Sequence, residues 1–98
     1  MKKNYKLEIL IPTYNRVKDL EKNLKILKDY IIKNKFLSEI RIIISDNNST
    51  DSTEKMILEL KKDEVLNKLI KYNKQIENIG LEKNALDILS KSEAEYIM

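Results

Sequence analysis

Two short runs of β-branched, apolar residues constrain the fold of this chain most strongly. The first run, Leu7–Ile11, ends at Pro12, and the second, Ile40–Ser45, is the strongest strand pattern in the sequence. Apolarity is nearly continuous in both, which is typical of strands covered on two faces in a parallel sheet. From Arg16 to about Asn34, apolar residues recur at spacings of three and four, which predicts a helix with one buried stripe. The stripe consists of Val17, Leu20, Leu24, Leu27 and Ile31.

The same alternation continues through the second half of the chain. The remaining predicted elements are a helix that opens on a capping box, Asp51 and Glu54, and fades over residues 61–63, a strand at Leu69–Tyr72, a helix from Leu81 to about Lys91, and a strand that begins at Tyr96–Met98. The order β-α-β-α-β-α-β predicts an α/β fold, with a mostly parallel sheet of three to four strands flanked by helices. The 98 residues allow a single domain, 1–98.

The composition excludes several mechanisms. Without His or Cys the chain has no Ser-His-Asp or Cys-His catalysis and no disulfide. No apolar run approaches the ~20 residues of a membrane span, and the first run is too short for a signal peptide. The net charge is +3, and the lysines are interleaved with Glu and Asp, as on ordinary solvated helices. We therefore expect a cytoplasmic protein, located in the cytosol or at the inner face of the membrane, with no nucleic-acid partner.

Three polar segments are predicted to meet at one edge of the sheet. Ligands of open α/β sheets bind outside the carboxyl ends of the strands, and Pro12–Arg16, Asp46–Asp51 and Lys74–Gly80 all follow strands there. They offer an aromatic face, carboxylates, amides, hydroxyls and a guanidinium beside helix N-termini with free N–H groups. Such a set suits a nucleotide, which presents a base, a ribose diol and phosphates.

Each polar segment also has a purely structural reading. Asn15 has the form of a helix N-cap, Asp46–Asp51 that of an Asn/Asp/Ser turn with a capping box, and Gly80 that of a residue with positive φ. One such loop alone is more often structural than functional. The functional reading depends on the three segments lying together.

Four segments carry a family resemblance: Ile9–Arg16, Ile42–Thr53, Asn78–Asn84 and Glu95–Ile97. The first resembles the first strand and loop of the family 2 inverting glycosyltransferases, which have a GT-A fold. The others resemble that family's second strand with its DDGSTD loop, its N-x-G-…-N helix start, and the GEYI strand that precedes the metal-binding DxD. The SDNxSTD form looks most like bacterial enzymes that build cell-surface polysaccharides, including abequosyltransferase-like members. The resemblance implies the Rossmann-like half of a GT-A fold.

The resemblance also implies roles for individual residues. Pro12 and Tyr14 would line the pocket for base and ribose, and Asp46 matches the first acidic position of the second loop, where it would contact the base or shape the loop. The next position, which usually reads a uracil N–H in the family, is Asn47, whose amide donates as well as accepts, so the base need not be uracil. Lys83 matches a cation that faces the nucleotide, with a solvated helix residue as the alternative. The predicted nucleotide-sugar-binding residues are Pro12, Thr13, Tyr14, Asn15, Arg16, Asp46, Asn47, Asn78, Gly80, Lys83 and Asn84.

In the family, the DxD carboxylates and the catalytic base follow the strand that matches Glu95–Ile97. The resemblance therefore implies that this chain is the nucleotide-binding N-terminal part of a glycosyltransferase, inactive alone and with no catalytic or metal-ligating residue of its own. The full-length parent would transfer a sugar from a nucleotide-diphosphate sugar to a polysaccharide or lipid-linked acceptor, with inversion and with Mn²⁺ or Mg²⁺ on the leaving diphosphate. No metal is expected on this chain.

Two other readings stay open. The chain is alternatively a non-catalytic module that binds a nucleotide or a partner protein, or a different small α/β protein such as a receiver-like or nucleic-acid-binding domain. A receiver should have an acidic pocket with a Lys at a late strand end, and that pattern is absent. An incomplete sheet with an open edge also predicts self-association.

Overall fold

The computed structural model describes residues 7–90 and 96–97, which form a four-stranded parallel sheet with helices on both faces. The strands are β1 (Leu7–Thr13), β2 (Ile40–Asp46), β3 (Ile70–Lys74) and β4 (Tyr96–Ile97), and the helices are α1 (Val17–Lys33), α2 (Thr53–Leu60), α3 (Glu64–Leu69) and α4 (Leu81–Ser90). The strand order is β3-β2-β1-β4. The prediction of a parallel α/β sheet with flanking helices is confirmed.

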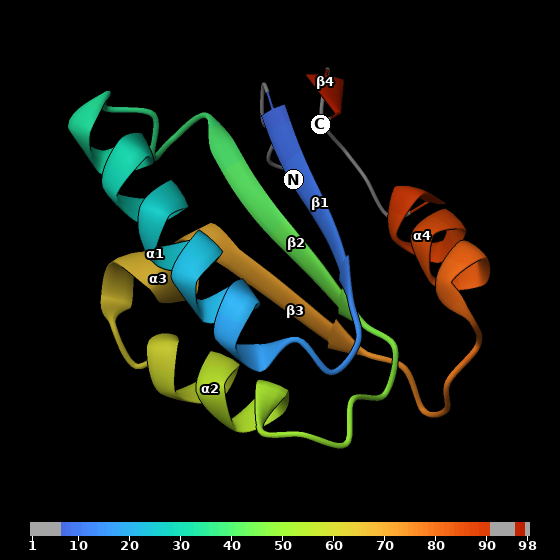
Figure 1. Cartoon of the computed structure of the whole chain (residues 1–98). Coiled ribbons are helices and arrows are strands. Elements are labelled where there is room, and N and C mark those ends of the chain that lie inside the picture. Colours follow the sequence, from blue (N-terminus) through green and yellow to red (C-terminus); the bar gives the residue numbers. More distant parts are fainter. Residues whose placement is uncertain (1–6, 91–95, 98) are drawn as a thin grey trace.

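The helices divide unequally between the two faces of the sheet (Figure 1). The chain steps outward from β1 to β2 to β3 and then returns past both strands to β4. Because parallel crossovers are right-handed, this reversal puts α4 on the face opposite α1, α2 and α3. The carboxyl ends of β1, β2 and β3 thus lead into helices on both faces, and a crevice forms between the connections.

The larger core lies under α1–α3 and is built from aliphatic side chains. Ile42 and Ile44 of β2 are at most 1 % exposed and pack against the buried stripe of α1. Within that stripe, Leu20, Leu24 and Ile31 are buried and Val17 and Leu27 are partly buried, as predicted. Each buried aliphatic side chain of this size contributes roughly 1.5–3 kcal/mol to stability. The sheet is therefore held chiefly by this face.

The face under α4 is smaller and more polar. Ile43 of β2 and Ile88 of α4 are buried there, and Glu8 pairs with Arg41 across β1 and β2. The sequence signal for this helix was four apolar residues, Leu81, Ala85, Ile88 and Leu89. Of these only Ile88 is buried, whereas Leu81 and Leu89 are 74 % and 48 % exposed.

β1 is longer than predicted because Pro12 does not end it. Thr13 accepts a hydrogen bond from the Asn47 N–H on the β2 side. Backbone groups of successive strand residues point in opposite directions, so the Pro12 nitrogen, which carries no hydrogen, faces the β4 side of β1. On that edge the two described residues of β4 pair with Leu7 and Glu8. A proline is tolerated where the strand has no hydrogen bond to make.

The third predicted strand is confirmed over Ile70–Tyr72, but its predicted start at Leu69 is wrong. Leu69 is the last residue of α3, a helix that the sequence reading missed, and β3 begins one residue later. Asp63 caps α3, because its carboxylate accepts hydrogen bonds from the N–H groups of Val65 and Leu66 at 2.8 and 3.3 Å. The connection between β2 and β3 therefore contains two helices. The predicted helix end at Lys91, the motif residue Glu95 and the strand residue Met98 lie outside the described residues.

Candidate functional site

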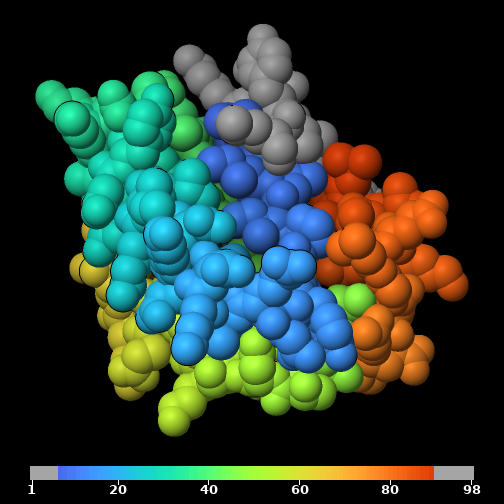
Figure 2. Space-filling view, in the orientation of Figure 1, coloured from blue at the N-terminus to red at the C-terminus, as the bar shows by residue number. Residues whose placement is uncertain are grey.

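The connections after β1, β2 and β3 together line one pocket of about 420 Å³ at the carboxyl edge of the sheet. Its lining residues are Pro12, Thr13, Tyr14, Arg16, Asn47, Asn78, Gly80, Leu81 and Asn84. Figure 2 shows atoms of the connection after β2 (green) between the connection after β1 (blue) and the segment around α4 (orange). Eight of the eleven predicted site residues line this pocket. None of its lining residues is a carboxylate, and Arg16 is its only cationic side chain.

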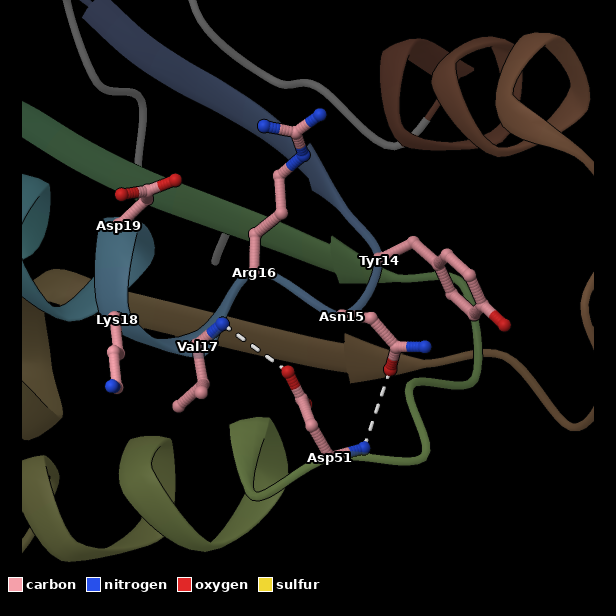
Figure 3. Close-up of a pocket in the computed structure, with 7 residues that line it drawn as sticks. All are labelled: Tyr14, Asn15, Arg16, Val17, Lys18, Asp19 and Asp51. Carbon is pink, nitrogen blue, oxygen red and sulfur yellow. Dashed lines mark hydrogen bonds between the residues drawn. The ribbon is translucent and has the colours of Figure 1, made fainter.

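A second, shallower hollow of about 600 Å³ lies over the start of α1 (Figure 3). Arg16 lines both hollows and extends along β1, while the Tyr14 ring points to the opposite side of the loop, toward α4. Among the described residues no carboxylate forms an ion pair with Arg16. Its guanidinium is therefore available to an anionic ligand.

Asn15 ties the first loop to the second instead of capping α1. Its φ is 49°, and its side-chain oxygen accepts a hydrogen bond from the Thr50 N–H at 2.8 Å. The same oxygen accepts from the Asp51 N–H at 3.2 Å (Figure 3). Arg16 occupies the N-cap position of α1 and makes no side-chain capping bond. The reading of Asn15 as an N-cap is wrong, because its amide is used between loops.

The predicted capping box of α2 does not form. Ser52 is the N-cap, and the Asp51 carboxylate instead accepts from the Thr53 N–H and hydroxyl at 3.0 and 2.5 Å and from the Val17 N–H at 3.3 Å. Glu54 turns away and pairs with Lys74 at 3.5 Å. Burial raises the pKa of Asp51, but these hydrogen bonds outweigh it and hold the pKa below its ordinary value. Asp51 thus joins α1 to α2.

Asp46 lies inside the protein, below the pocket. Its side chain is fully buried; one carboxylate oxygen accepts from the Ser49 N–H and hydroxyl at 2.9 and 2.6 Å, and the other accepts from the Tyr72 hydroxyl at 2.5 Å. Burial and the hydrogen bond to Asp46 raise the pKa of the Tyr72 hydroxyl well above its ordinary value. Both oxygens of Asp46 therefore hold the loop that follows β2. Ser49 and Tyr72 were missed at the sequence level.

Asn47 joins the second loop to the third. Its N–H donates to the Thr13 carbonyl at 2.9 Å, its amide nitrogen donates to the Asn78 side-chain oxygen at 2.8 Å, and its amide oxygen accepts from the Ile79 N–H at 2.8 Å. The same Asn78 oxygen accepts from the Gly80 N–H at 2.8 Å. Gly80 has φ 87°, as the sequence reading expected. The two backbone donors fix the orientation of both amides.

Asn84 anchors α4 beneath the pocket. It is fully buried; its amide nitrogen donates to the Ser45 carbonyl at 2.8 Å, and its oxygen accepts from the Ser45 hydroxyl at 2.6 Å. Gln75 donates to the same oxygen at 3.1 Å. A third pocket lies between β1 and α1 and is lined by Pro12, Thr13 and Arg16 among others. Lys83, the neighbour of Asn84, is exposed and lines none of these three pockets.

Residues 7–90 and 96–97 hold no group of three or more His, Cys, Asp or Glu side chains that could bind a metal ion. Within the same residues, every helix is too short or too polar to cross a bilayer.

Two curated proteins with similar sequences are bacterial glycosyltransferases. A family model described as glycosyl transferase family 2 matches residues 8–98. The abequosyltransferase RfbV of Salmonella typhimurium is 37 % identical over 90 residues, which are 92 % of this chain and 26 % of that protein. A GalNAc(5)-diNAcBac-PP-undecaprenol β-1,3-glucosyltransferase of Campylobacter jejuni is 39 % identical over 59 residues, 60 % of this chain and 18 % of that protein. The chain thus spans about a quarter or less of these curated relatives.

Solved structures agree in fold. The mannosyltransferase PcManGT of Pyrobaculum calidifontis, solved with GDP-Man and Mn²⁺, matches with a TM-score of 0.70 at 19 % identity, over 89 % of this chain and 24 % of that one. S. aureus TarS matches with a TM-score of 0.72 at 23 % identity, over 95 % of this chain and 26 % of that one. The neighbours are GT-A glycosyltransferases, so the fold is that Rossmann-like α/β half. With its family match over nearly the whole length, this chain belongs to glycosyl transferase family 2.

Proposed function

We propose that this chain, with residues 1–98 as one nucleotide-binding unit, holds the nucleotide of a sugar donor in a glycosyltransferase. The reaction would move a sugar from a nucleotide-diphosphate sugar to a polysaccharide or lipid-linked acceptor. Family membership supports this proposal, as do the names of the relatives, one of which includes an undecaprenol-linked saccharide. A cytoplasmic location and self-association remain predictions from the sequence.

The observation that carries the proposal is the pocket in which the three loops meet. It combines one exposed aromatic ring, three amide side chains, no carboxylate, and the guanidinium of Arg16, which has no ion-pair partner among the described residues. A carboxylate would repel a diphosphate, whereas a guanidinium can donate two parallel hydrogen bonds to the oxygens of one phosphate. The pocket therefore suits an anion with a planar ring attached.

We assign different parts of the nucleotide to different loops. Tyr14, 42 % exposed, is placed to contact the base or ribose, and Arg16 to contact the diphosphate. Asn47 and Asn78 line the pocket, but their amides are already hydrogen-bonded to each other and to backbone N–H groups. Their role is to shape the wall. The residue that recognises the base therefore need not be Asn47.

A divalent metal remains a prediction for the transfer reaction. A bound metal would neutralise charge on the leaving diphosphate, but the described residues do not provide a ligand set for it. We therefore assign no step to a metal. The role proposed for this chain is to bind and orient the donor.

The test is isothermal titration calorimetry of the 98-residue chain with UDP-, GDP-, CDP- and dTDP-sugars, with and without Mn²⁺. We expect at least one donor to bind, and Arg16→Gln to weaken that binding about tenfold, because it removes a charge-assisted contact to phosphate. Lys33→Gln removes the same charge from the far end of α1 and should leave the affinity unchanged. Absence of binding to every donor would contradict the proposal and favour a partner-binding module.

A further inference from the structure

The buried carboxylate of Asp46 is held entirely by neutral donors. Within the described part of the chain no Lys or Arg pairs with it, and its three hydrogen bonds come from the Ser49 N–H, the Ser49 hydroxyl and the Tyr72 hydroxyl. A buried carboxylate that loses a donor carries a large desolvation cost. The conformation of the loop after β2 is therefore tied to the Tyr72 side chain, which stands on the neighbouring strand, β3.

The hydrogen bonds continue from Ser49 to the first loop. The Ser49 hydroxyl, which donates to Asp46, accepts from the Asn15 N–H at 2.9 Å. Asn15 adopts φ 49°, a conformation that L-residues rarely take without local hydrogen bonds, and it follows Tyr14 directly. We call these four residues, Tyr72, Asp46, Ser49 and Asn15, the edge relay. The relay crosses the carboxyl edge of the sheet from β3 past β2 to β1.

We propose that Tyr72 is a positioning residue for the donor pocket, acting through the edge relay on Tyr14 and Arg16. The predicted effect on donor affinity rests on the proposed function. Tyr72 itself lines none of the three pockets at this edge, so it acts at a distance from the ligand. Its ring is only partly buried and packs against the main core, a contact that phenylalanine can also make. The positioning role is therefore carried by the hydroxyl.

The first arm of the test measures amide hydrogen exchange by NMR in Tyr72→Phe. We expect the Ser49 and Asn15 amides to exchange at least roughly tenfold faster, because the loss of the Tyr72 donor loosens Asp46. Tyr30→Phe removes a hydroxyl from a side chain that is 60 % exposed and should change neither amide. Ser49→Ala interrupts the relay one step later and should speed exchange at Asn15 in the same way.

The second arm measures donor affinity of the same variants by calorimetry. Tyr72→Phe should bind the donor several-fold more weakly, and its Ser49 and Asn15 amides should be accelerated more than its core amides. Tyr30→Phe should bind the donor as the unsubstituted chain does. Unchanged exchange at Ser49 and Asn15 in Tyr72→Phe would overturn the inference. Acceleration spread evenly over the core amides would also overturn it, since that is the sign of a merely structural residue. If the unsubstituted chain binds no donor, the proposed function fails. The exchange measurement still tests whether Tyr72 controls the conformation of Ser49 and Asn15.

Discussion

The core under α1–α3 and the carboxyl edge of the sheet are stabilised by different forces. The core consists of aliphatic side chains such as Leu24, Ile44 and Ile57, each at most 1 % exposed. The edge contains buried polar side chains instead, with Asp46 and Asn84 fully buried and hydrogen-bonded. Apolar burial is not directional, whereas a hydrogen bond requires its partner at one distance and angle. The core therefore determines that the chain folds, and the edge determines the shape of the pocket.

The largest expected effect lies in the core. Leu24→Ala removes a side chain that is 1 % exposed in the middle of α1, and we expect it to lower the free energy of unfolding by about 3 kcal/mol. Ile26→Ala, on the same helix but 55 % exposed, should cost less than about 0.5 kcal/mol. Urea denaturation followed by circular dichroism measures both. Equal losses in the two variants would show that α1 does not pack as described.

A smaller but more local effect is expected at the edge. Asp46→Ala leaves the Ser49 N–H, the Ser49 hydroxyl and the Tyr72 hydroxyl without their acceptor, at a cost of about 2 kcal/mol. Unlike Leu24→Ala, this change should also shift the NMR signals of the first loop, around Asn15. If those signals stay in place, the first and second loops are not coupled through Asp46 and the contrast between core and edge fails.

Asn84→Ala tests the anchoring of α4. The substitution removes two buried hydrogen bonds to Ser45, and we expect a loss of about 1 kcal/mol together with faster amide exchange confined to α4. Lys83→Ala, one residue earlier and exposed, serves as the matched control and should leave exchange unchanged. An effect of Lys83→Ala as large as that of Asn84→Ala would contradict the assignment.

The core could be predicted from the sequence because burial leaves a periodic signal. The stripe of α1 and the isoleucines of β2 were identified correctly, since apolar residues recur at helical spacing in one and nearly without interruption in the other. The short α3 was missed because two buried leucines, Leu66 and Leu69, are too few for a period. Its only clear signal was Asp63, a good N-cap residue directly before Glu64.

The edge could be predicted only in part. Parallel topology brought the three loops to one rim, but the partners of each polar side chain depend on three-dimensional contacts. Tyr72 lies 26 residues from Asp46 in the sequence, and nothing in the local pattern connects them. Asp51 and Glu54 have the spacing of a capping box, yet Asp51 accepts hydrogen bonds from Thr53 and Val17, and Glu54 pairs with Lys74. Hydrogen bonds between loops leave no periodic trace in the sequence.

Asn47→Asp refines the comparison with a nearly isosteric change. A carboxylate can still accept from the Ile79 N–H, but it cannot donate to the Asn78 oxygen, which must keep accepting from the Gly80 N–H. We expect a loss of about 1 kcal/mol and faster exchange at Ile79 and Gly80. Unchanged exchange at both amides would mean that Asn47 does not hold the third loop.

The smallest effect is a dependence on acid pH. Hydrogen bonds from the Leu66 and Val65 N–H groups lower the pKa of Asp63. The pKa of Asp51 is also lowered, because hydrogen bonds from Thr53 and Val17 outweigh the effect of burial. A depressed carboxyl pKa adds stability above the unfolded pKa that is lost as the pH falls through the folded pKa. Helices α2 and α3 should therefore loosen below about pH 4 before the core does, as followed by NMR. Asp63→Asn should weaken this dependence in α3 alone, and a response identical to that of the parent would contradict the account.

The most direct measurement is a ¹H–¹⁵N NMR titration of the chain with UDP, GDP, CDP and dTDP. If the three loops form one nucleotide pocket, at least one of these ligands will shift the amide signals of Tyr14, Asn47 and Gly80 together, at the same ligand concentration, and leave those of Glu64–Leu69 unmoved. No shift with any of the four, or shifts confined to α2 and α3, would contradict the proposal that the carboxyl edge binds the donor.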